Sequence, residues 1–329
     1  MLHLCLEMGS QETTFGGYLA LDDRAERSPL DRTGVCLGTG RACIAAASKA
    51  VSPKRVWVPH YICDTALQGL EAEGVAVARY PLNDKLLPSD LPDPSPDAML
   101  LVVDYFGLLG AEAEAVVENW GGRGILDRSQ AFFAGPAAGC WTFTSFRKFF
   151  GVPDGAQLWG PGKIEPPTTR NEAPMLDHLV LAQAGEQGAG LEYHRKNEAL
   201  MSVDYRGCAW ISEVLMERTD RQAARRRRTA NFQRLHELLG AHNELQLAWD
   251  LADGPYAYPF LPKQELDLAR LHERGIHAPR LWPELLERNG LPRWEQHLVE
   301  QLKPLPVDQR YTPDGMVQMA ERILHMLGA

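Results

Sequence analysis

The chain has 329 residues, of which 45% are hydrophobic and 23% are charged, the balance of an ordinary globular protein. This length suits one large domain accompanied by a smaller one. The formal net charge of -9 argues against a polyanionic partner such as nucleic acid. The one local exception is the run Arg225–Arg228, which we interpret as a solvated helix face or a rim of partner contacts. A nucleic-acid patch is the alternative, and no second basic cluster supports it.

The six cysteines show no C-x-x-C spacing, so neither zinc nor thioredoxin-like chemistry is indicated. Several lie in apolar stretches, and we expect buried thiols in a reducing compartment. The first ten residues lack the basic region of a signal peptide. No apolar run approaches the length that spans a bilayer. We therefore expect a cytoplasmic protein without a metal site.

Glycines open the first clear helix. A mixed N-terminal arm contains a candidate short strand at 15–21, and the run Gly38–Arg41 then precedes an alanine-rich helix at 42–51. Backbone N–H groups at such a helix start can hold a phosphate. A dinucleotide fingerprint needs a third glycine where Cys43 stands, and no clear strand precedes the run. A Walker loop needs a Gly-Lys-Ser/Thr sequence, which is absent here. A phosphate cup for a smaller cofactor and a simple helix cap both remain open.

Strands and helices alternate through the next hundred residues. Strands are expected at 55–59, 75–82, 98–107 and 124–127, with helices at 64–73 and 111–121. This alternation predicts an α/β fold with a large, doubly wound, mainly parallel sheet. Ligands of such sheets bind beyond the carboxyl ends of the strands. The polar residues expected at those ends are Tyr61, Asp104, Asp127, Ser145 and Lys148.

The second half begins with a turn and strand at 151–159, followed by two long helical regions at 175–200 and 209–239. A smaller C-terminal α+β domain should follow, with strands at 257–261 and 303–311. Its helices are expected at 264–274, 293–302 and 313–327. We therefore predict a large cofactor-binding domain, including the N-terminal arm, over 1–205. The small domain should cover 206–329.

The stretch 123–157 combines an acid and an amine at neighbouring strand ends. Asp127 ends one short apolar run, and Lys148 follows a second that ends near Ser145. Of the eight lysines, Lys148 alone has an aromatic, apolar setting. Pyridoxal phosphate requires an acid that keeps its pyridine nitrogen protonated and an amine that forms a Schiff base. This stretch therefore predicts a pyridoxal-phosphate site.

Six segments in order resemble the DegT/DnrJ/EryC1/StrS family. They are TGRACIAAA, VWVPHYICDTAL, VVDYFG, ILDRSQAFFA, FTSFRKFFGVPDGA and, near the C-terminus, LPVDQRYTPDGM. The likeness is good over about residues 35–160 and loose beyond. Family members are fold type I pyridoxal-phosphate enzymes, mostly nucleotide-sugar aminotransferases. The resemblance implies the same fold, cofactor and activity for this chain.

Carried over by position, the resemblance implies that Lys148 binds the cofactor covalently and then acts as the general base. Asp127 would pair with the pyridine nitrogen. Gln130 would lie near the O3′ edge of the ring, and Tyr61 would stack on its face. The phosphate would be held by Gly40 and Arg41, with hydroxyls from Ser145 and Thr39.

The function implied by the family is amination of a keto-sugar nucleotide with glutamate as amino donor, in polysaccharide or sugar biosynthesis. Family members are homodimers with the site at the subunit interface. The segment Asp204–Arg206 matches only imperfectly the family's Asn-Tyr-Arg element, which contacts the partner. Another pyridoxal-phosphate reaction and a non-catalytic binding protein on the same fold are the alternatives.

Overall fold

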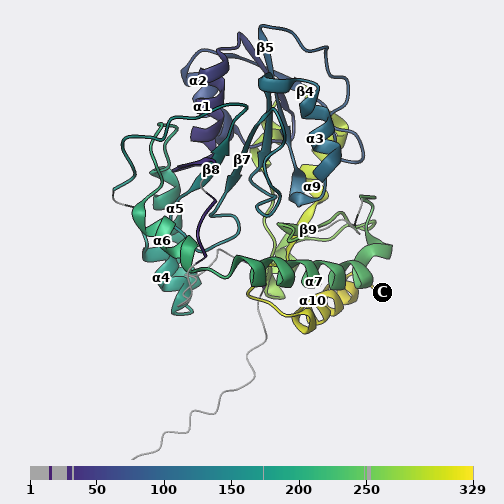
Figure 1. The fold of residues 1–329 in the computed structure, drawn as a ribbon. Coiled ribbons are helices and arrows are strands. Elements are labelled where there is room, and N and C mark those ends of the chain that lie inside the picture. The colour runs from purple at the N-terminus through teal and green to yellow at the C-terminus, as the bar shows by residue number, and fades with distance from the viewer. Residues whose placement is uncertain are drawn as a thin grey trace, which may run out of the picture.

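The structure is a computed structural model that describes residues 15–16, 28–31, 33–172, 174–247, 249 and 253–328 (Figure 1). Its centre is a seven-stranded sheet with the order β2-β8-β7-β6-β5-β3-β4. The strands are β2 Val35–Leu37, β3 Arg55–Pro59, β4 Ala76–Tyr80, β5 Ala98–Val103, β6 Gly124–Arg128, β7 Trp141–Ser145 and β8 Ala156–Trp159. Only β8 runs antiparallel to its neighbours. The predicted mainly parallel α/β sheet is confirmed.

The central strands are apolar because helices cover both faces of the sheet. All six residues of β5 and all five of β6 are buried, as expected for parallel strands covered on two sides. Helices α1 Gly40–Val51 and α2 Gln68–Ala72 lie on one side, and α3 Gly110–Glu118 lies on the other (Figure 1). Short 3-10 turns, η1 Asp64–Leu67, η2 Tyr105–Gly107 and η3 Gly121–Arg123, complete the connections.

A strand does precede the glycine run, so our expectation of none there was wrong. β2 is three residues long and pairs with β8 at the edge of the sheet. A strand this short gives little periodic signal in the sequence. Its position matters because β2 delivers Gly38–Arg41 to the carboxyl edge of the sheet.

Each of the two long helical regions consists of two helices. The first contains α4 Asp177–Gln183 and α5 Gln187–Ala199, separated by Gly185 in a left-handed conformation. The second contains α6 Trp210–Arg218 and α7 Arg221–Leu239. Asp220 caps α7 by accepting a hydrogen bond from the N–H of Ala223 at 2.8 Å. Aspartate is a preferred N-cap residue, so a new helix can begin here after the break.

The C-terminal part is built on α7 and α10 Pro313–Leu327, which pack against each other below the large sheet in Figure 1. A small antiparallel sheet joins β9 Ala257–Phe260 to β11 Lys303–Pro306. β1 Phe15–Gly16 pairs with β10 Ile276–His277, while residues 17–21 of the predicted first strand lie outside the described part. The remaining elements are η4 Gly240–His242, α8 Leu268–Glu273, η6 Pro283–Glu287 and α9 Arg293–Gln301. The boundary at 205/206 stays a prediction.

The arginine run on α7 is not a uniformly solvated face. Arg225 is ion-paired with Asp253, and Arg226 is exposed. Arg228 is fully buried, donates to the carbonyl oxygens of Pro255, Tyr256 and Phe149, and lies over the Phe149 ring. Its guanidinium therefore joins the C-terminal part to the loop that carries Lys148.

Candidate active site

A cavity of about 320 Å³ lies at the carboxyl ends of β5, β6 and β7, beside the start of α1. Seven of the eight predicted cofactor residues line it: Thr39, Gly40, Arg41, Asp127, Gln130, Ser145 and Lys148. The apolar part of the wall includes Ile44, Ile62, Val103, Phe143 and Trp282. The fold thus brings together segments separated by more than a hundred residues, as the sheet topology requires.

Ser129 connects the predicted acid to the predicted amine. Lys148 Nζ donates to Ser129 Oγ at 2.7 Å, and the backbone N–H of Ser129 donates to Asp127 Oδ1 at 2.7 Å. β6 and β7 are parallel, and Asp127 pairs with Phe143. The carboxyl ends of the two strands therefore lie at the same edge of the sheet. The sequence reasoning missed Ser129, although its place between Asp127 and Gln130 was an available signal.

Asp127 is a buried carboxyl in the cavity wall. Burial raises its pKa, while the charge of Lys148 and the hydrogen bonds from Ser129 act in the opposite direction. A carboxylate at this depth is stabilised by a cationic partner. A protonated ring nitrogen in the cavity would be such a partner for Asp127.

The N-terminus of α1 meets the cavity through Thr39, Gly40 and Arg41. The Thr39 hydroxyl accepts from the N–H of Ala42 at 3.1 Å and donates to the carbonyl of Ser202 at 2.7 Å. Thr39 is thus the N-cap of α1, a helix of 12 residues. The backbone of the first turn of this helix lies beside the cavity. A Cβ on Gly40 would lie 3.0 Å from the Phe143 ring, so a larger residue here would require the ring to shift slightly. Such a helix start favours an anion.

The orientation of Gln130 is fixed by the backbone. Its Oε1 accepts from the N–H of Phe106 at 2.8 Å. Ser145, the last residue of β7, lines the same cavity, and its backbone pairs with Ala156 of β8. Both side chains are therefore carried by well-anchored backbone.

Tyr61 does not line the cavity. It is fully buried behind the wall, against Tyr105 and against Trp282, whose ring centroid is 4.6 Å away. Trp282 lines the cavity instead and has a left-handed backbone, with φ of 52°. The sequence did not indicate that Trp282 lines the cavity, because this residue lies in a loop more than 130 residues after Lys148.

Asp104, expected at the same strand-end edge, faces away from the cavity. Its Oδ1 accepts from the N–H of Leu109 at 3.0 Å, and Oδ2 lies 3.6 Å from Arg128 Nε. Burial raises the pKa of Asp104, and the charge of Arg128 lowers it. These contacts are structural, since they close the turn after β5.

A second hollow of about 510 Å³ adjoins the first and shares Ser145, Arg147, Lys148 and Glu198 with it. An ion pair joins Arg147 to Glu198 between the two. The far wall of the second hollow carries His194, Arg228, His277, Asp308 and Arg310. Basic side chains predominate, which suits an anionic ligand.

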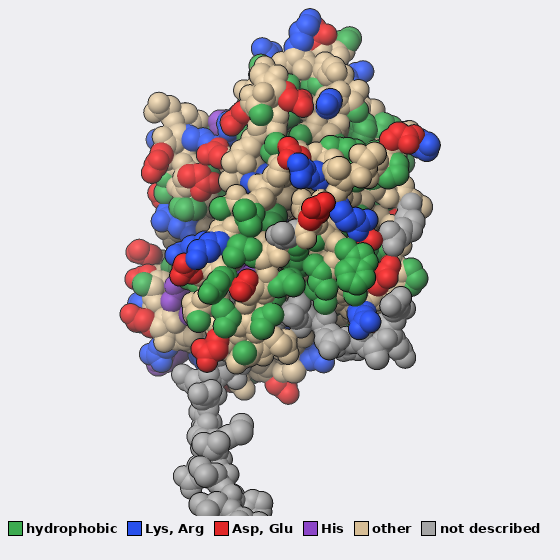
Figure 2. All heavy atoms as spheres, turned by 90° about the vertical axis from the view of Figure 1, so that its left-hand side faces the viewer, with side chains coloured by type: hydrophobic (Ala, Val, Ile, Leu, Met, Phe, Trp, Pro, Cys, Tyr) green, Lys and Arg blue, Asp and Glu red, His purple; other side chains and the backbone are tan. Residues whose placement is uncertain are grey.

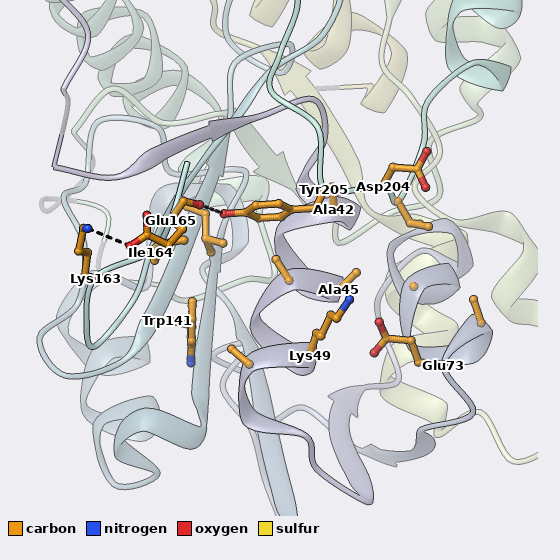
Figure 3. A pocket seen from close by; sticks show the side chains of 16 residues that line it. Ala42, Ala45, Lys49, Glu73, Trp141, Lys163, Ile164, Glu165, Asp204 and Tyr205 are labelled. Carbon is orange, nitrogen blue, oxygen red and sulfur yellow. Dashed lines mark hydrogen bonds and ion pairs between the residues drawn. The ribbon is translucent and has the colours of Figure 1, made fainter. Parts of the chain in front are cut away.

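Another hollow, of about 590 Å³, contains none of the predicted cofactor residues (Figure 3). It lies against the alanine face of α1 and is lined by Lys49, Trp141 and Ile164 among others. Asp204 and Tyr205 line it as well, so the Asp204–Arg206 segment lies outside the candidate active site.

The chain matches no protein-family model and no curated protein. Solved structures do share its fold. Helicobacter pylori PseC, an aminotransferase involved in the biosynthesis of pseudoaminic acid, superposes with a TM-score of 0.65 at 11% identity, covering 96% of this chain and 100% of the other. A DegT DnrJ EryC1 StrS aminotransferase from Brucella abortus gives 0.62 at 14%, covering 90% and 86%. The sugar aminotransferase CalS13 from Micromonospora echinospora gives 0.60 at 15%, covering 88% and 86%. At these identities the likeness establishes the fold.

Proposed function

We propose that this chain is a pyridoxal-phosphate-dependent aminotransferase of the DegT/DnrJ/EryC1/StrS family. The observation that carries the proposal is the Asp127–Ser129–Lys148 arrangement beside the N-terminus of α1, within one cavity. An acid, an amine and an anion-binding helix start are the three groups that this cofactor requires. They come from separate segments of a fold shared with aminotransferases.

The residues present fit the cofactor. Asp127 would hold a protonated ring nitrogen, and the first turn of α1, with Gly40, Arg41 and Ser145, would hold the phosphate. Lys148 Nζ would form the covalent attachment. The apolar surfaces of Phe143 and Trp282 match an aromatic ring in character. This set supports pyridoxal phosphate more closely than a dinucleotide, which would need a longer cleft and the missing third glycine.

When bound, the cofactor supplies an electron sink for charge that develops on the substrate carbon. The chain itself would supply proton transfer, because Lys148 Nζ, once free, can accept a proton from the amino-donor carbon and return it. Ser129 Oγ holds Nζ at the wall in the free protein and would guide it during this exchange. The buried position of Asp127 keeps its interaction with the ring nitrogen strong, since little water competes there.

We propose a keto-sugar nucleotide as amino acceptor and glutamate as amino donor. The support is the second hollow, where Arg147 and Arg310, ion-paired with Glu198 and Asp308, add guanidinium groups that suit carboxylate or phosphate groups. One neighbour is described as a sugar aminotransferase, and another as involved in the biosynthesis of pseudoaminic acid. A product for polysaccharide or sugar biosynthesis follows from that substrate class.

We also propose a homodimer. Except for Leu286, the large hydrophobic side chains that are exposed in the described residues lie between 180 and 210, with Trp210 at 66%. Figure 2 faces this side of the molecule, which carries α4, α5 and α6 and shows hydrophobic side chains among charged ones. Exposed apolar groups gathered on one side mark an association surface. None of the described helices has the length and apolar character to cross a bilayer, and the cytoplasmic location stays a prediction.

The absorbance spectrum of the purified protein tests the proposal. We expect a visible band with pyridoxal phosphate that disappears on addition of glutamate, with formation of 2-oxoglutarate. Borohydride reduction and peptide mass spectrometry should place the cofactor on Lys148. Lys148→Ala should abolish the band, and the matched variant Lys163→Ala, at an exposed ion-paired lysine, should keep it. A cofactor adduct on another lysine, or no band at all, would overturn the proposal. A band without 2-oxoglutarate would instead support another pyridoxal-phosphate reaction.

A further inference from the structure

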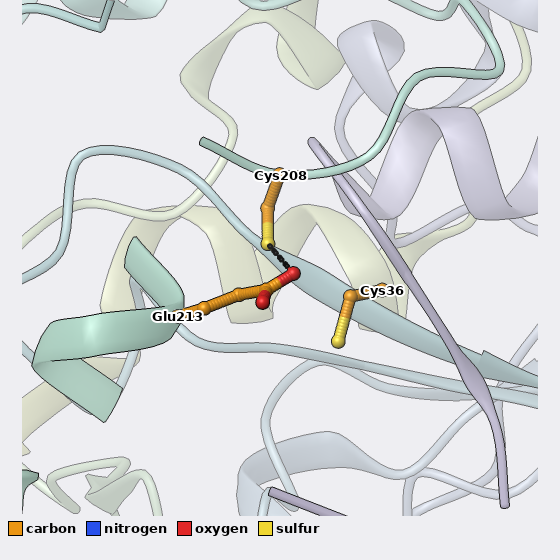
Figure 4. A group of neighbouring side chains, drawn as sticks. All are labelled: Cys36, Cys208 and Glu213. Carbon is orange, nitrogen blue, oxygen red and sulfur yellow. Dashed lines mark hydrogen bonds between the residues drawn. The ribbon is translucent and has the colours of Figure 1, made fainter. Parts of the chain in front are cut away.

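Three metal-ligand atoms meet away from the active-site cavity, on Cys36, Cys208 and Glu213 (Figure 4). The two sulfur atoms and a carboxylate oxygen all lie within 4.8 Å of one another. Cys208 Sγ lies 3.9 Å from Glu213 Oε1. Within the described part of the chain, this is the one group of three such side chains that converges in this way.

The fold fixes these side chains by different means. Residues alternate between the faces of β2, so Leu37 packs into the main core while Cys36 packs on the opposite face. Cys208 lies two residues before α6, and Glu213 lies in the first turn of that helix. The segment is anchored because Asp154 accepts from the N–H of Ala209 at 3.0 Å. The cysteine spacing does not indicate this group, since Cys36 and Cys208 are far apart in the chain.

Two thiolates and a carboxylate form a ligand set for a thiophilic divalent ion. Zn²⁺ binds thiolate sulfur at about 2.3 Å and carboxylate oxygen at about 2.0 Å in tetrahedral geometry, so neighbouring ligand atoms lie roughly 3.5 to 3.8 Å apart. The sulfur–oxygen separation in this geometry is about 3.5 Å, and Cys208 Sγ and Glu213 Oε1, at 3.9 Å, would approach by about 0.4 Å on binding. Thiolate ligands select Zn²⁺ over hard ions such as Mg²⁺.

Charge and access are also consistent with an ion. A guanidinium nitrogen of Arg170 lies 3.7 Å from Glu213 Oε1. With both thiols deprotonated, the three ligands carry three negative charges, which a divalent ion and Arg170 together balance. Cys36, Glu213 and Arg170 line a hollow of about 800 Å³, which gives an entry path and room for a water as fourth ligand.

We propose that Cys36, Cys208 and Glu213 bind one Zn²⁺ ion. The ion would stabilise the start of α1, where Thr39, Gly40 and Arg41 line the active-site cavity. The ion would link β2 to the start of α6, two segments already in contact where the N–H of Gly38 donates to the carbonyl of Arg206 at 2.9 Å. Gly38 leads directly into the first turn of α1. Metal binding therefore stabilises the folded chain and holds this turn, independently of the reaction catalysed.

Titration of Zn²⁺ into the full-length chain, reduced, treated with EDTA and free of any polyhistidine tag, tests the proposal. We expect one equivalent to bind and the Tm to rise. Cys36→Ala and Cys208→Ala should each weaken binding by more than about 100-fold, since loss of a direct ligand exceeds the effect of an outer-shell change. Cys63→Ala, at a cysteine that does not line this hollow, is the matched control and should bind as the wild type does.

Alkylation of the unmodified chain gives a readout that needs no variant. Zn²⁺ should protect Cys36 and Cys208 from a thiol reagent and leave Cys63 unaffected, as measured by peptide mass spectrometry. Absence of Zn²⁺ binding by the reduced wild type would overturn the proposal, and so would binding that survives both cysteine substitutions. A Cys36–Cys208 disulfide in a chain whose reduced form binds no Zn²⁺ would assign the pair to thiol oxidation instead.

Discussion

Lys148 Nζ donates a hydrogen bond of 2.7 Å to the hydroxyl of Ser129. The backbone N–H of the same serine donates to the carboxylate of Asp127. One residue thus positions both groups on which the proposed chemistry depends. An amine held at a fixed place in the wall begins proton transfer from a defined geometry, which is how positioned groups lower a barrier.

Ser129→Ala should lower kcat by about tenfold, because the hydrogen bond that positions Nζ is worth about 1.5 kcal/mol. The backbone contact to Asp127 remains in this variant, so cofactor binding should change little. Single-turnover measurement of the half-reaction with glutamate checks the effect. Ser129→Thr retains the hydroxyl and should recover most of the rate. An unchanged rate in Ser129→Ala would show that the contact has no role in positioning.

Asp127→Asn should raise the stability of the cofactor-free chain at pH 7 and lower the activity of the loaded enzyme. Burial raises the folded-state pKa of Asp127 above its unfolded value. Below the unfolded pKa the carboxyl is protonated in both states, and it has no effect on stability. As pH rises from the unfolded pKa to the folded pKa, the unfolded chain loses this proton first, so the stability of the folded state falls. The cofactor-free variant should therefore unfold at higher urea than the wild type at pH 7, with the difference vanishing near pH 4.

The same variant should lose activity on the order of 100- to 1000-fold, as expected when a preorganised charge is removed from a buried site. Urea unfolding of the cofactor-free chains at the two pH values, followed by steady-state assays of the loaded enzymes, checks both effects. A variant less stable than the wild type at pH 7 would contradict the assignment of burial as the dominant influence on Asp127.

Arg228→Ala should reduce the free energy of unfolding by about 3 to 5 kcal/mol, the cost of breaking a buried charged network. Its guanidinium donates to three carbonyl oxygens, and these would lose their partner. Arg226→Ala, two residues earlier on the exposed face of α7, should change stability by less than about 0.5 kcal/mol. Chemical denaturation of the two variants makes the comparison. If both variants lose the same unfolding free energy, the buried contacts of Arg228 do not stabilise the fold.

His178 should make the chain less stable in mild acid. Burial lowers its pKa to about 4, and His194 and Arg147 act in the same direction, while Asp177 opposes them. Both folded and unfolded chains hold a neutral imidazole above pH 6.5, so the full stability is present there. As pH falls from 6.5 towards 4, protonation favours the unfolded chain and stability is lost.

His178→Gln should therefore show a smaller loss of unfolding free energy between pH 7 and pH 5 than the wild type does. His325→Gln, at an exposed histidine of α10, should behave like the wild type. Urea unfolding at both pH values measures the difference. If the unfolding free energy of all three proteins falls equally between pH 7 and pH 5, His178 is not the cause of the acid destabilisation. Because His178 contacts His194 of α5, with ring centroids 5.3 Å apart, the loss should begin in α4 and α5.

The sequence alone determined the elements whose signals are local. β3 covers Arg55–Pro59 and α10 covers Pro313–Leu327, the ranges predicted from apolar pattern, proline and turn chemistry. The candidate cavity was also predictable to a large degree. Asp127, Ser145 and Lys148 end consecutive parallel strands or follow them directly, and parallel strands end at a common edge.

The tertiary structure decided what depends on segments distant in the chain. Tyr61 was expected in the cavity, but Trp282 occupies that wall and Tyr61 packs behind it. Cys36 and Cys208 face each other, although nothing in their spacing indicates it. Periodicity and turn residues report only on neighbours within a few positions. Which side chain reaches a cavity is set by packing across the whole fold, where many long-range contacts are satisfied together.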